Sequence, residues 1–252
     1  MQMVHFVGAG SGAPDLITVR GMRLLQEADV VIYAGSLVNP ELLKYCKEGT
    51  EIHDSAQMHL EEVLSVMERA EGEGKTTVRL HTGDPSIYGA IREQMDALRA
   101  RGIAFDICPG VSSMSAAAAA LQVEYTLPDV AQTVIISRAA GCTPVPEKED
   151  LPKLAAIGAT LVLFLSAGQT EAVQAALLQG AYTEATPCAI VYKASWPEEK
   201  ILRGTVGTLA QMAEENGIRK TALIVVGDVL GDDYALSKLY DKHFTTGYRK
   251  GV

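Results

Sequence analysis

Short apolar runs recur along the chain and alternate with segments that have the spacing of amphipathic helices. The runs predict strands at residues 3–7, 30–33, 77–80, 105–108, 133–137, 160–165, 188–192 and 222–226. Between the second and third runs, the i, i+3, i+4, i+7 spacing predicts a helix whose apolar face is formed by Leu60, Val63, Leu64 and Met67. Strands that alternate with helices predict an α/β fold with a mainly parallel sheet covered on both faces.

The periodicity breaks near the middle of the chain. Residues 122–132 follow neither spacing, and Pro128 interrupts any helix there. We therefore expect two α/β domains with mainly parallel or mixed sheets, one over residues 1–121 and one over residues 122–252. A later loop, residues 139–150, is rich in proline and acidic residues, which suits either a lid or a solvated connection.

Charge and composition narrow the classes of function. The chain has 22 Lys and Arg against 31 Asp and Glu, a net charge of −9, which argues against a general nucleic-acid binder. Its four cysteines are far apart, none of its five histidines pairs at i, i+4, and no apolar run is long enough to span a membrane. No secretory signal is visible. We expect a cytoplasmic protein with no metal site and no membrane or nucleic-acid partner.

A glycine-rich turn follows the first predicted strand. Residues 8–12 read Gly-Ala-Gly-Ser-Gly, which invites comparison with dinucleotide-binding turns. The glycine spacing is GxGxG rather than GxGxxG, and Ala34 stands where a ribose-binding acid would end the second strand. No Gly-Lys-Ser/Thr follows, so the turn is not a phosphate-binding P-loop. The turn also fits a tight bend that needs glycine for a positive φ.

Two further turns follow predicted strands. His81 to Gly89 comes after the third strand, and Pro109 to Ser113 comes after the fourth. In open α/β sheets, ligands bind at the carboxyl ends of the strands. Asp84 is either a helix N-cap or a group that faces a cationic ligand. The serines before the alanine-rich helix either cap that helix or offer hydroxyl and N–H groups to a ligand.

The three turns, in this order, resemble the tetrapyrrole methyltransferase family, most closely the branch that methylates precorrin-4 at C11, with or without cobalt. The resemblance covers nearly the whole chain and is carried by residues 6–21, 34–38, 82–89, 109–113, 124–128, 137–147, 192–197 and 222–227. It implies two α/β domains with S-adenosylmethionine folded in the cleft between them, S-adenosylhomocysteine as the product, and a homodimer.

The resemblance also implies roles for individual residues. Those carried over as contacts of the methyl donor are Pro14, Thr82, Gly83, Asp84, Ile87, Ser112, Ser113, Leu165, Ala194 and Ala222. Arg138 and Arg20 are candidates for the carboxylates of the tetrapyrrole. Two positions depart from the pattern: Ala34 replaces an acid of the uroporphyrinogen-methylating relatives, and Cys142 replaces a residue that is commonly basic in the branch. No catalytic residue is carried over.

Two alternatives stay open at this point. One is another enzyme of the same family, acting on a different precorrin or on the diphthamide precursor of a protein. The other is a non-catalytic nucleotide-binding regulator, since small residues around a pocket suit either class. Residues 137–147 favour a precorrin as substrate. Any cobalt would belong to the macrocycle and not to a site on the protein.

Overall fold

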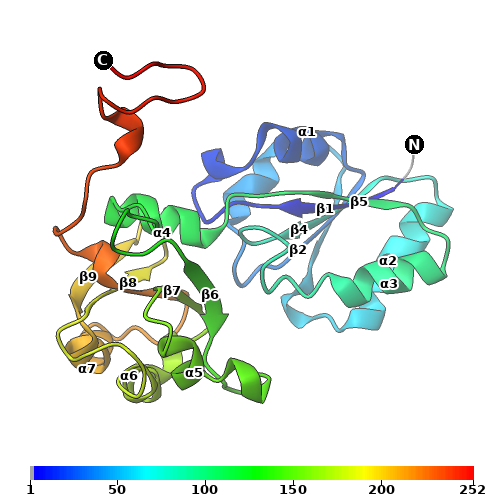
Figure 1. The fold of residues 1–252 in the computed structure, drawn as a ribbon. Helices are drawn as coiled ribbons and strands as arrows, with labels where there is room; N and C mark the ends of the chain where they lie inside the picture. The colour runs from blue at the N-terminus through cyan, green and yellow to red at the C-terminus, as the bar shows by residue number, and fades with distance from the viewer. Residues whose placement is uncertain (1–2) are drawn as a thin grey trace. The chain divides into compact units, whose positions relative to one another are not determined.

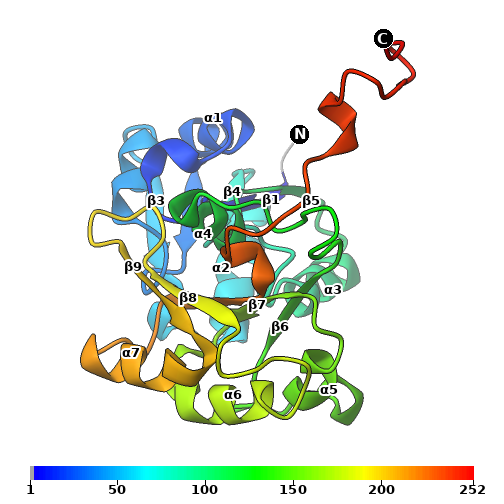
Figure 2. The same cartoon turned by 60° about the vertical axis from the view of Figure 1, so that its left-hand side comes forward.

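The computed structural model describes residues 3–252, which form two compact units. The first contains the chain up to Ala116 together with Lys193–Glu198, and the second contains Ala117–Tyr192 and Glu199–Val252. Each unit has a five-stranded sheet with helices packed against it (Figures 1 and 2). Within the described residues, no helix has both the length and the hydropathy needed to cross a membrane.

The first sheet is entirely parallel, with strand order β3-β2-β4-β1-β5. Its strands are β1 (Val4–Gly8), β2 (Val30–Tyr33), β3 (Glu51–Asp54), β4 (Thr77–His81) and β5 (Phe105–Cys108). Parallel strands all end at the same edge of a sheet. The turns after β1, β4 and β5, which are adjacent in the sheet, therefore meet at that edge.

Helices cover both faces of this sheet (Figure 1). On one face, α2 (Leu60–Gly72) and α3 (Arg92–Ala100) pack with Phe6 and Ile32. On the other face, α1 (Val19–Glu27) packs with Val7 and Leu80. This arrangement confirms the predicted α/β layering, and the predicted apolar face of α2 lies in the core.

The second sheet is mixed, with strand order β6-β7-β10-β8-β9. Its β6–β7 pair is parallel and the other pairs are antiparallel. The strands are β6 (Val134–Arg138), β7 (Thr160–Phe164), β8 (Pro187–Tyr192), β9 (Lys200–Thr205) and β10 (Ala222–Val226). One face is covered by α5 (Leu151–Ala155), α6 (Thr170–Leu177) and α7 (Leu209–Glu215). The remaining helix, α4 (Ser113–Leu121), follows β5.

All eight predicted strands are present to within a residue at each end. Two strands were missed, β3 and β9, and both lie at the edge of a sheet. β3 reads Glu-Ile-His-Asp, with Ile52 substantially exposed, so it has no apolar run to detect. Edge strands need less burial than central strands, because they have a neighbouring strand on one side only and their other hydrogen-bonding edge faces solvent.

Strand β4 places polar side chains inside the core. Val78 and Leu80 pack on the α1 face, so Arg79 and His81 point to the α2 and α3 face. Arg79 is 7% exposed, and its guanidinium donates to the Gln94 side chain and to a backbone carbonyl of β2, over 3.3 and 3.2 Å. Burial lowers the pKa of Arg79 to about 10. Among residues 3–252, no carboxylate forms a salt bridge with this arginine.

His81 is the second polar group in this part of the core. It is 6% exposed, and its Nε2 atom has no hydrogen-bond partner within the described chain. Burial, and then the positive charge of Arg79, lower the pKa of His81 to about 3, so the imidazole is neutral at physiological pH.

This burial makes stability depend on pH. Between about pH 6.5 and 3, the unfolded chain binds a proton at His81 that the folded chain does not, so stability falls as the pH falls through that window. We expect a loss on the order of a few kcal/mol from this group. Urea unfolding from pH 7 to 4 should show a shallower pH dependence for His81→Phe, but not for His59→Phe, which removes an exposed histidine. Equal slopes for His81→Phe and the natural chain would contradict this account.

Candidate functional site

Three turns meet at the carboxyl edge of the first sheet. The turns after β1 and β4 are joined by a bridge in which Gly83 N donates to Gly10 O over 2.8 Å and Gly10 N donates to Gly83 O over 3.3 Å. The turn after β5 is tied to them by Asp84, whose carboxylate accepts a 2.9 Å hydrogen bond from Gly110 N. The structure thus brings together the three turns that the sequence singled out.

Bare backbone makes this close approach possible. A Cβ atom on Gly110 would lie 2.2 Å from Gly83 O and 2.7 Å from Gly8 Cα, and one on Gly8 would lie 2.5 Å from Gly110 Cα. These distances are well below any normal contact of a carbon atom. Gly83 also has a φ of +60°, in the left-handed region that favours glycine. We call Gly8, Gly83 and Gly110 the glycine cradle.

The cradle faces the start of α4. A Cβ on Gly83 would lie 3.5 Å from Ser113 N and 3.7 Å from Ser112 Cα, so these three predicted contacts of the methyl donor are neighbours. The first N–H groups of a helix have no partner inside the helix, and they carry a partial positive charge. Both serines are half-buried. This edge therefore places hydrogen-bond donors at the start of α4 beside the glycine cradle.

Asp84 holds two of the turns in place. Besides Gly110, its carboxylate accepts hydrogen bonds from Ser86 N, over 2.9 Å, and from the Ser86 hydroxyl. Burial opposes ionisation, but the hydrogen bonds from Ser86 and Gly110 outweigh it and lower the pKa of Asp84. The side chain is thus an ionised carboxylate that fixes its own loop. Its contact with a ligand stays a prediction.

The other predicted residues of this unit border the same turns. Thr82 Oγ1 donates to Leu37 O over 3.3 Å, and Ile87 N donates to Asp84 O over 3.3 Å. Pro14 opens a short 3₁₀ helix directly after the first turn. Thr82, Ile87 and Pro14 are all half-buried, so each keeps surface that a ligand can contact.

Sequence reasoning missed a second support of the first turn. Residues Lys193–Glu198, which we call the strap, return to the first unit after β8. Ser195 Oγ accepts a 3.0 Å hydrogen bond from Ala13 N and lies 2.9 Å from Ser11 Oγ. Trp196 Nε1 donates to Ser11 O over 3.1 Å. These contacts join residues more than 180 positions apart in the sequence.

The ring of Trp196 also explains a glycine. A Cβ on Gly12 would lie 2.1 Å from Trp196 Cδ1, so the indole occupies the space that a side chain there would need. Ala194, a predicted contact of the methyl donor, is buried in the same strap. The only sequence signal for this contact is the small residue at position 12, and that residue does not indicate which side chain packs against it.

The predicted residues of the second unit gather at one end of its sheet. Arg138, at the end of β6, pairs with Phe164, at the end of β7, and Leu165 is the next residue after Phe164. Ala222 opens β10, and the antiparallel register of β7 and β10 brings it level with Leu165. Leu165 is 68% exposed and has a φ of +53°. A bulky apolar residue held in this strained conformation and open to solvent is typical of a functional position.

Arg138 has a structural role in the loop that follows it. Its guanidinium donates to the carbonyl oxygens of Ala139, Thr143 and Pro144 over 3.3, 3.0 and 2.7 Å. A guanidinium has five N–H donors, so two remain beyond these three bonds. Arg20, the other predicted substrate contact, is exposed on α1.

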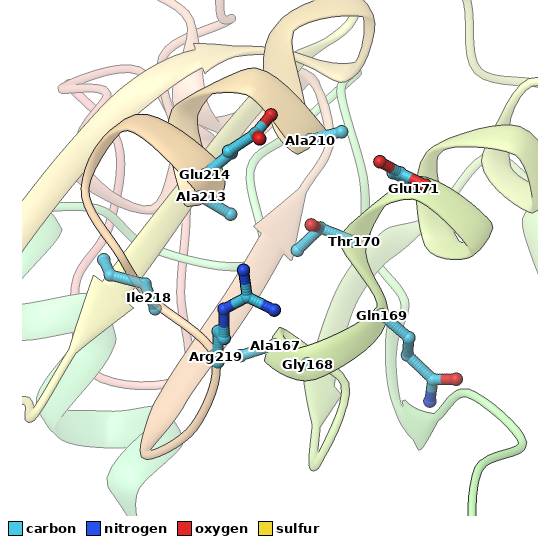
Figure 3. A pocket seen from close by; sticks show the side chains of 10 residues that line it. All are labelled: Ala167, Gly168, Gln169, Thr170, Glu171, Ala210, Ala213, Glu214, Ile218 and Arg219. Carbon is cyan, nitrogen blue, oxygen red and sulfur yellow. The ribbon is translucent and has the colours of Figure 1, made fainter.

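A cavity of about 230 Å³ lies elsewhere in the second unit, between the start of α6 and the end of α7 (Figure 3). Glu171, Glu214 and Arg219 are its charged residues. None of the residues predicted to contact the methyl donor or substrate lines it. Across residues 3–252, no His, Cys, Asp and Glu side chains form a group that could hold a metal ion. The four cysteines are free thiols, and Cys142 is exposed.

Comparison with known proteins gives a consistent family. A model of the tetrapyrrole (corrin/porphyrin) methylases matches residues 3–210. A cobalt-precorrin-4 C(11)-methyltransferase of Methanocaldococcus jannaschii is 56% identical over 248 residues, which cover 98% of this chain and 96% of that protein. A precorrin-4 C(11)-methyltransferase of Mycobacterium tuberculosis is 48% identical and covers 94% of this chain and 95% of its own.

Solved structures agree. A cobalt precorrin-4 methyltransferase, described as a cobalamin biosynthetic enzyme, superposes with a TM-score of 0.89 at 50% identity, over 91% of this chain and 96% of that one. A uroporphyrin-III C-methyl transferase of Thermus thermophilus, in complex with S-adenosylhomocysteine, superposes with a TM-score of 0.76 at 27% identity, over 90% of this chain and 93% of that one.

The close packing of the glycine cradle predicts that alanine substitutions at two glycines have very different effects on the free energy of unfolding. Gly110→Ala forces a methyl group against the backbone, and we expect it to lower the free energy of unfolding by about 1–3 kcal/mol or more. Gly72→Ala, at the end of α2 with no atom near its Cβ, should leave stability unchanged or raise it by up to about 1 kcal/mol. Chemical denaturation measures both. A Gly110→Ala chain as stable as Gly72→Ala would refute the backbone contact.

Proposed function

The chain belongs to the tetrapyrrole (corrin/porphyrin) methylases, and from this premise we propose that it methylates cobalt-precorrin-4 at C11 with S-adenosylmethionine, in cobalamin biosynthesis. The products are S-adenosylhomocysteine and the precorrin-5 intermediate. The observation that carries the proposal is identity of 56% along nearly the whole length of a relative of that name. We choose cobalt-precorrin-4 as the proposed substrate because the relative named a precorrin-4 C(11)-methyltransferase is less similar to this chain, at 48% identity.

The first unit suits the methyl donor. The glycine cradle holds the three turns together beside the start of α4, which offers N–H groups and serine hydroxyls to the polar atoms of a ligand. The ionised Asp84 complements the positive charge of a sulfonium. We infer that Pro14, Thr82, Ile87 and Ala194 complete this side. Leu165 and Ala222 are the contacts proposed from the second unit.

The protein's task in such a reaction is to position its two reactants. When bound, S-adenosylmethionine supplies an electrophilic methyl group that a carbon nucleophile can take by in-line displacement. Asp84 ties together the turns after β4 and β5, and the strap holds the turn after β1, so we propose that these three turns form a fixed seat for the methyl donor. Alignment of reactants can contribute roughly 7–11 kcal/mol to a rate enhancement, so no acid–base pair is required for the transfer itself.

Binding of the substrate must overcome an unfavourable net charge. A precorrin carries several carboxylates and the chain has a net charge of −9, so the overall field opposes their association. We propose that Arg138 and Arg20 provide local attraction. The two N–H groups of Arg138 that are not used by its loop can still pair with a carboxylate.

We also propose that the protein acts as a homodimer in the cytoplasm. The homodimer follows from the family resemblance. Four free cysteines suit a reducing compartment, where disulfides are rare. We propose neither a nucleic acid nor a membrane as a partner.

Turnover with two substrates tests the function. The enzyme is incubated anaerobically with S-adenosylmethionine and either cobalt-precorrin-4 or metal-free precorrin-4, and the products are analysed by mass spectrometry. We expect one added methyl group and an equal amount of S-adenosylhomocysteine, formed faster with the cobalt form. Isotopic labelling at C11 locates the methyl group. No methylation of either form would overturn the proposal, and faster turnover of the metal-free form would reassign the substrate.

A pair of substitutions tests whether Arg138 itself, and not any exposed arginine, contributes to binding of the precorrin. Loss of a charge-assisted hydrogen bond costs about 1.5–3 kcal/mol, so Arg138→Ala should raise the KM for the precorrin roughly tenfold or more. Affinity for S-adenosylhomocysteine should change little, and added salt should matter less than in the natural enzyme. Arg92→Ala, on the exposed face of α3, is the control and should behave like the natural chain. Unchanged KM in Arg138→Ala would leave only its role in the loop.

A further inference from the structure

The last residues of the chain carry an unusual amount of exposed apolar surface. Seven of the sixteen large apolar side chains that are exposed in the described chain lie between residues 234 and 252: Tyr234, Leu236, Leu239, Tyr240, Phe244, Tyr248 and Val252. Their exposed fractions run from 41% for Phe244 to complete exposure for Tyr248. Apolar groups gathered on one surface usually mark a contact with another molecule, whereas scattered ones do not.

This segment has a shape of its own. Leu239 and Tyr240 lie in a short 3₁₀ helix, Lys238–Tyr240, and Val252 N donates to Lys242 O over 2.9 Å. Arg249 Nη2 donates to the carbonyl oxygens of Leu239 and Asp241 over 2.9 and 2.7 Å. In the described structure, the hydrogen bonds of residues 237–252 all run within the segment. In both views it leads away from the sheet of the second unit (Figures 1 and 2).

The net charge of this segment indicates the kind of surface that it binds. Residues 234–252 contain four Lys or Arg and one Asp, a net charge of +3. The remaining residues contain 18 Lys or Arg and 30 Asp or Glu, a net charge of −12. A basic, apolar segment on an acidic protein is complementary to another copy of that protein, and such complementarity favours association.

We propose that residues 234–252 form an arm that docks on a second copy of this chain. In a symmetric pair each arm would reach the other subunit, so the same contact forms twice. The arm has 19 residues, close to the roughly 20–30 that one partner contributes to a stable interface. The inference rests on the homodimer proposed above and adds to it the segment that makes the contact.

A membrane surface is the other class of partner for a basic segment rich in tyrosine and leucine, and the observations oppose it. Segments that lie on membranes are usually amphipathic helices, and the arm has only a three-residue 3₁₀ helix. The charge of −12 on the rest of the chain would also repel an anionic lipid surface.

Sedimentation and light scattering across dilution test the arm. The natural chain should have about twice the 26.9 kDa chain mass. A chain that ends at Asp233 should be monomeric at concentrations where the natural chain is dimeric. The full-length double variant Leu239→Ser with Tyr240→Ser should weaken the dimer roughly tenfold or more. Ile157→Ser, which removes an exposed apolar residue outside the arm, is the matched control and should leave the dimer intact.

Several outcomes would overturn the proposal. A shortened chain that stays folded by circular dichroism and dimerises like the natural one would show that the arm makes no such contact. A monomeric natural chain would remove the homodimer, yet it would leave the methyl transfer assay unaffected. Sedimentation of the natural chain, but not the shortened one, with vesicles of phosphatidylserine and phosphatidylcholine would assign the arm to membranes instead.

Discussion

The contact of three glycine backbones is the constraint on which the rest of this site depends. Gly8, Gly83 and Gly110 lie so close that a methyl group on Gly8 or Gly110 would overlap the neighbouring main chain. The contact is possible because β1, β4 and β5 are adjacent and parallel, so that their carboxyl ends reach one edge. It leaves a surface of peptide groups and small side chains beside the start of α4. Such a surface can hold a ligand through the main chain.

Two kinds of support keep this surface in place. Within the cradle, the ionised Asp84 ties the turn after β4 to the turn after β5. From much later in the chain, Ser195 and Trp196 hold the turn after β1, and the indole covers Gly12. A rigid arrangement of this kind suits a reaction in which alignment supplies much of the rate enhancement. It also accounts for a site built mostly from glycine, serine and alanine, with few ionisable groups.

Periodicity and turn chemistry predicted most of the fold, because buried strands are continuous apolar runs and the three turns follow them directly. They failed where the signal is not local. β3 and β9 are edge strands, and β3 lacks an apolar pattern. The return of the strap to the first unit joins distant residues and leaves no trace except a small residue at position 12. The carbonyl oxygens that Arg138 binds in its own loop also cannot be identified from the sequence, because a sequence does not show where a guanidinium points.

The central claim is that the glycine cradle seats the methyl donor. Calorimetric titration of S-adenosylhomocysteine into Gly83→Ala and Gly102→Ala tests it most directly. Both glycines have a positive φ, +60° and +69°, so both variants carry a similar backbone strain of about 1–2 kcal/mol. Only the methyl group at position 83 would stand 3.5 Å from Ser113 N and shield that N–H from a ligand. The account predicts that Gly83→Ala loses most of its affinity while Gly102→Ala keeps it. Equal affinity in two folded variants would contradict it.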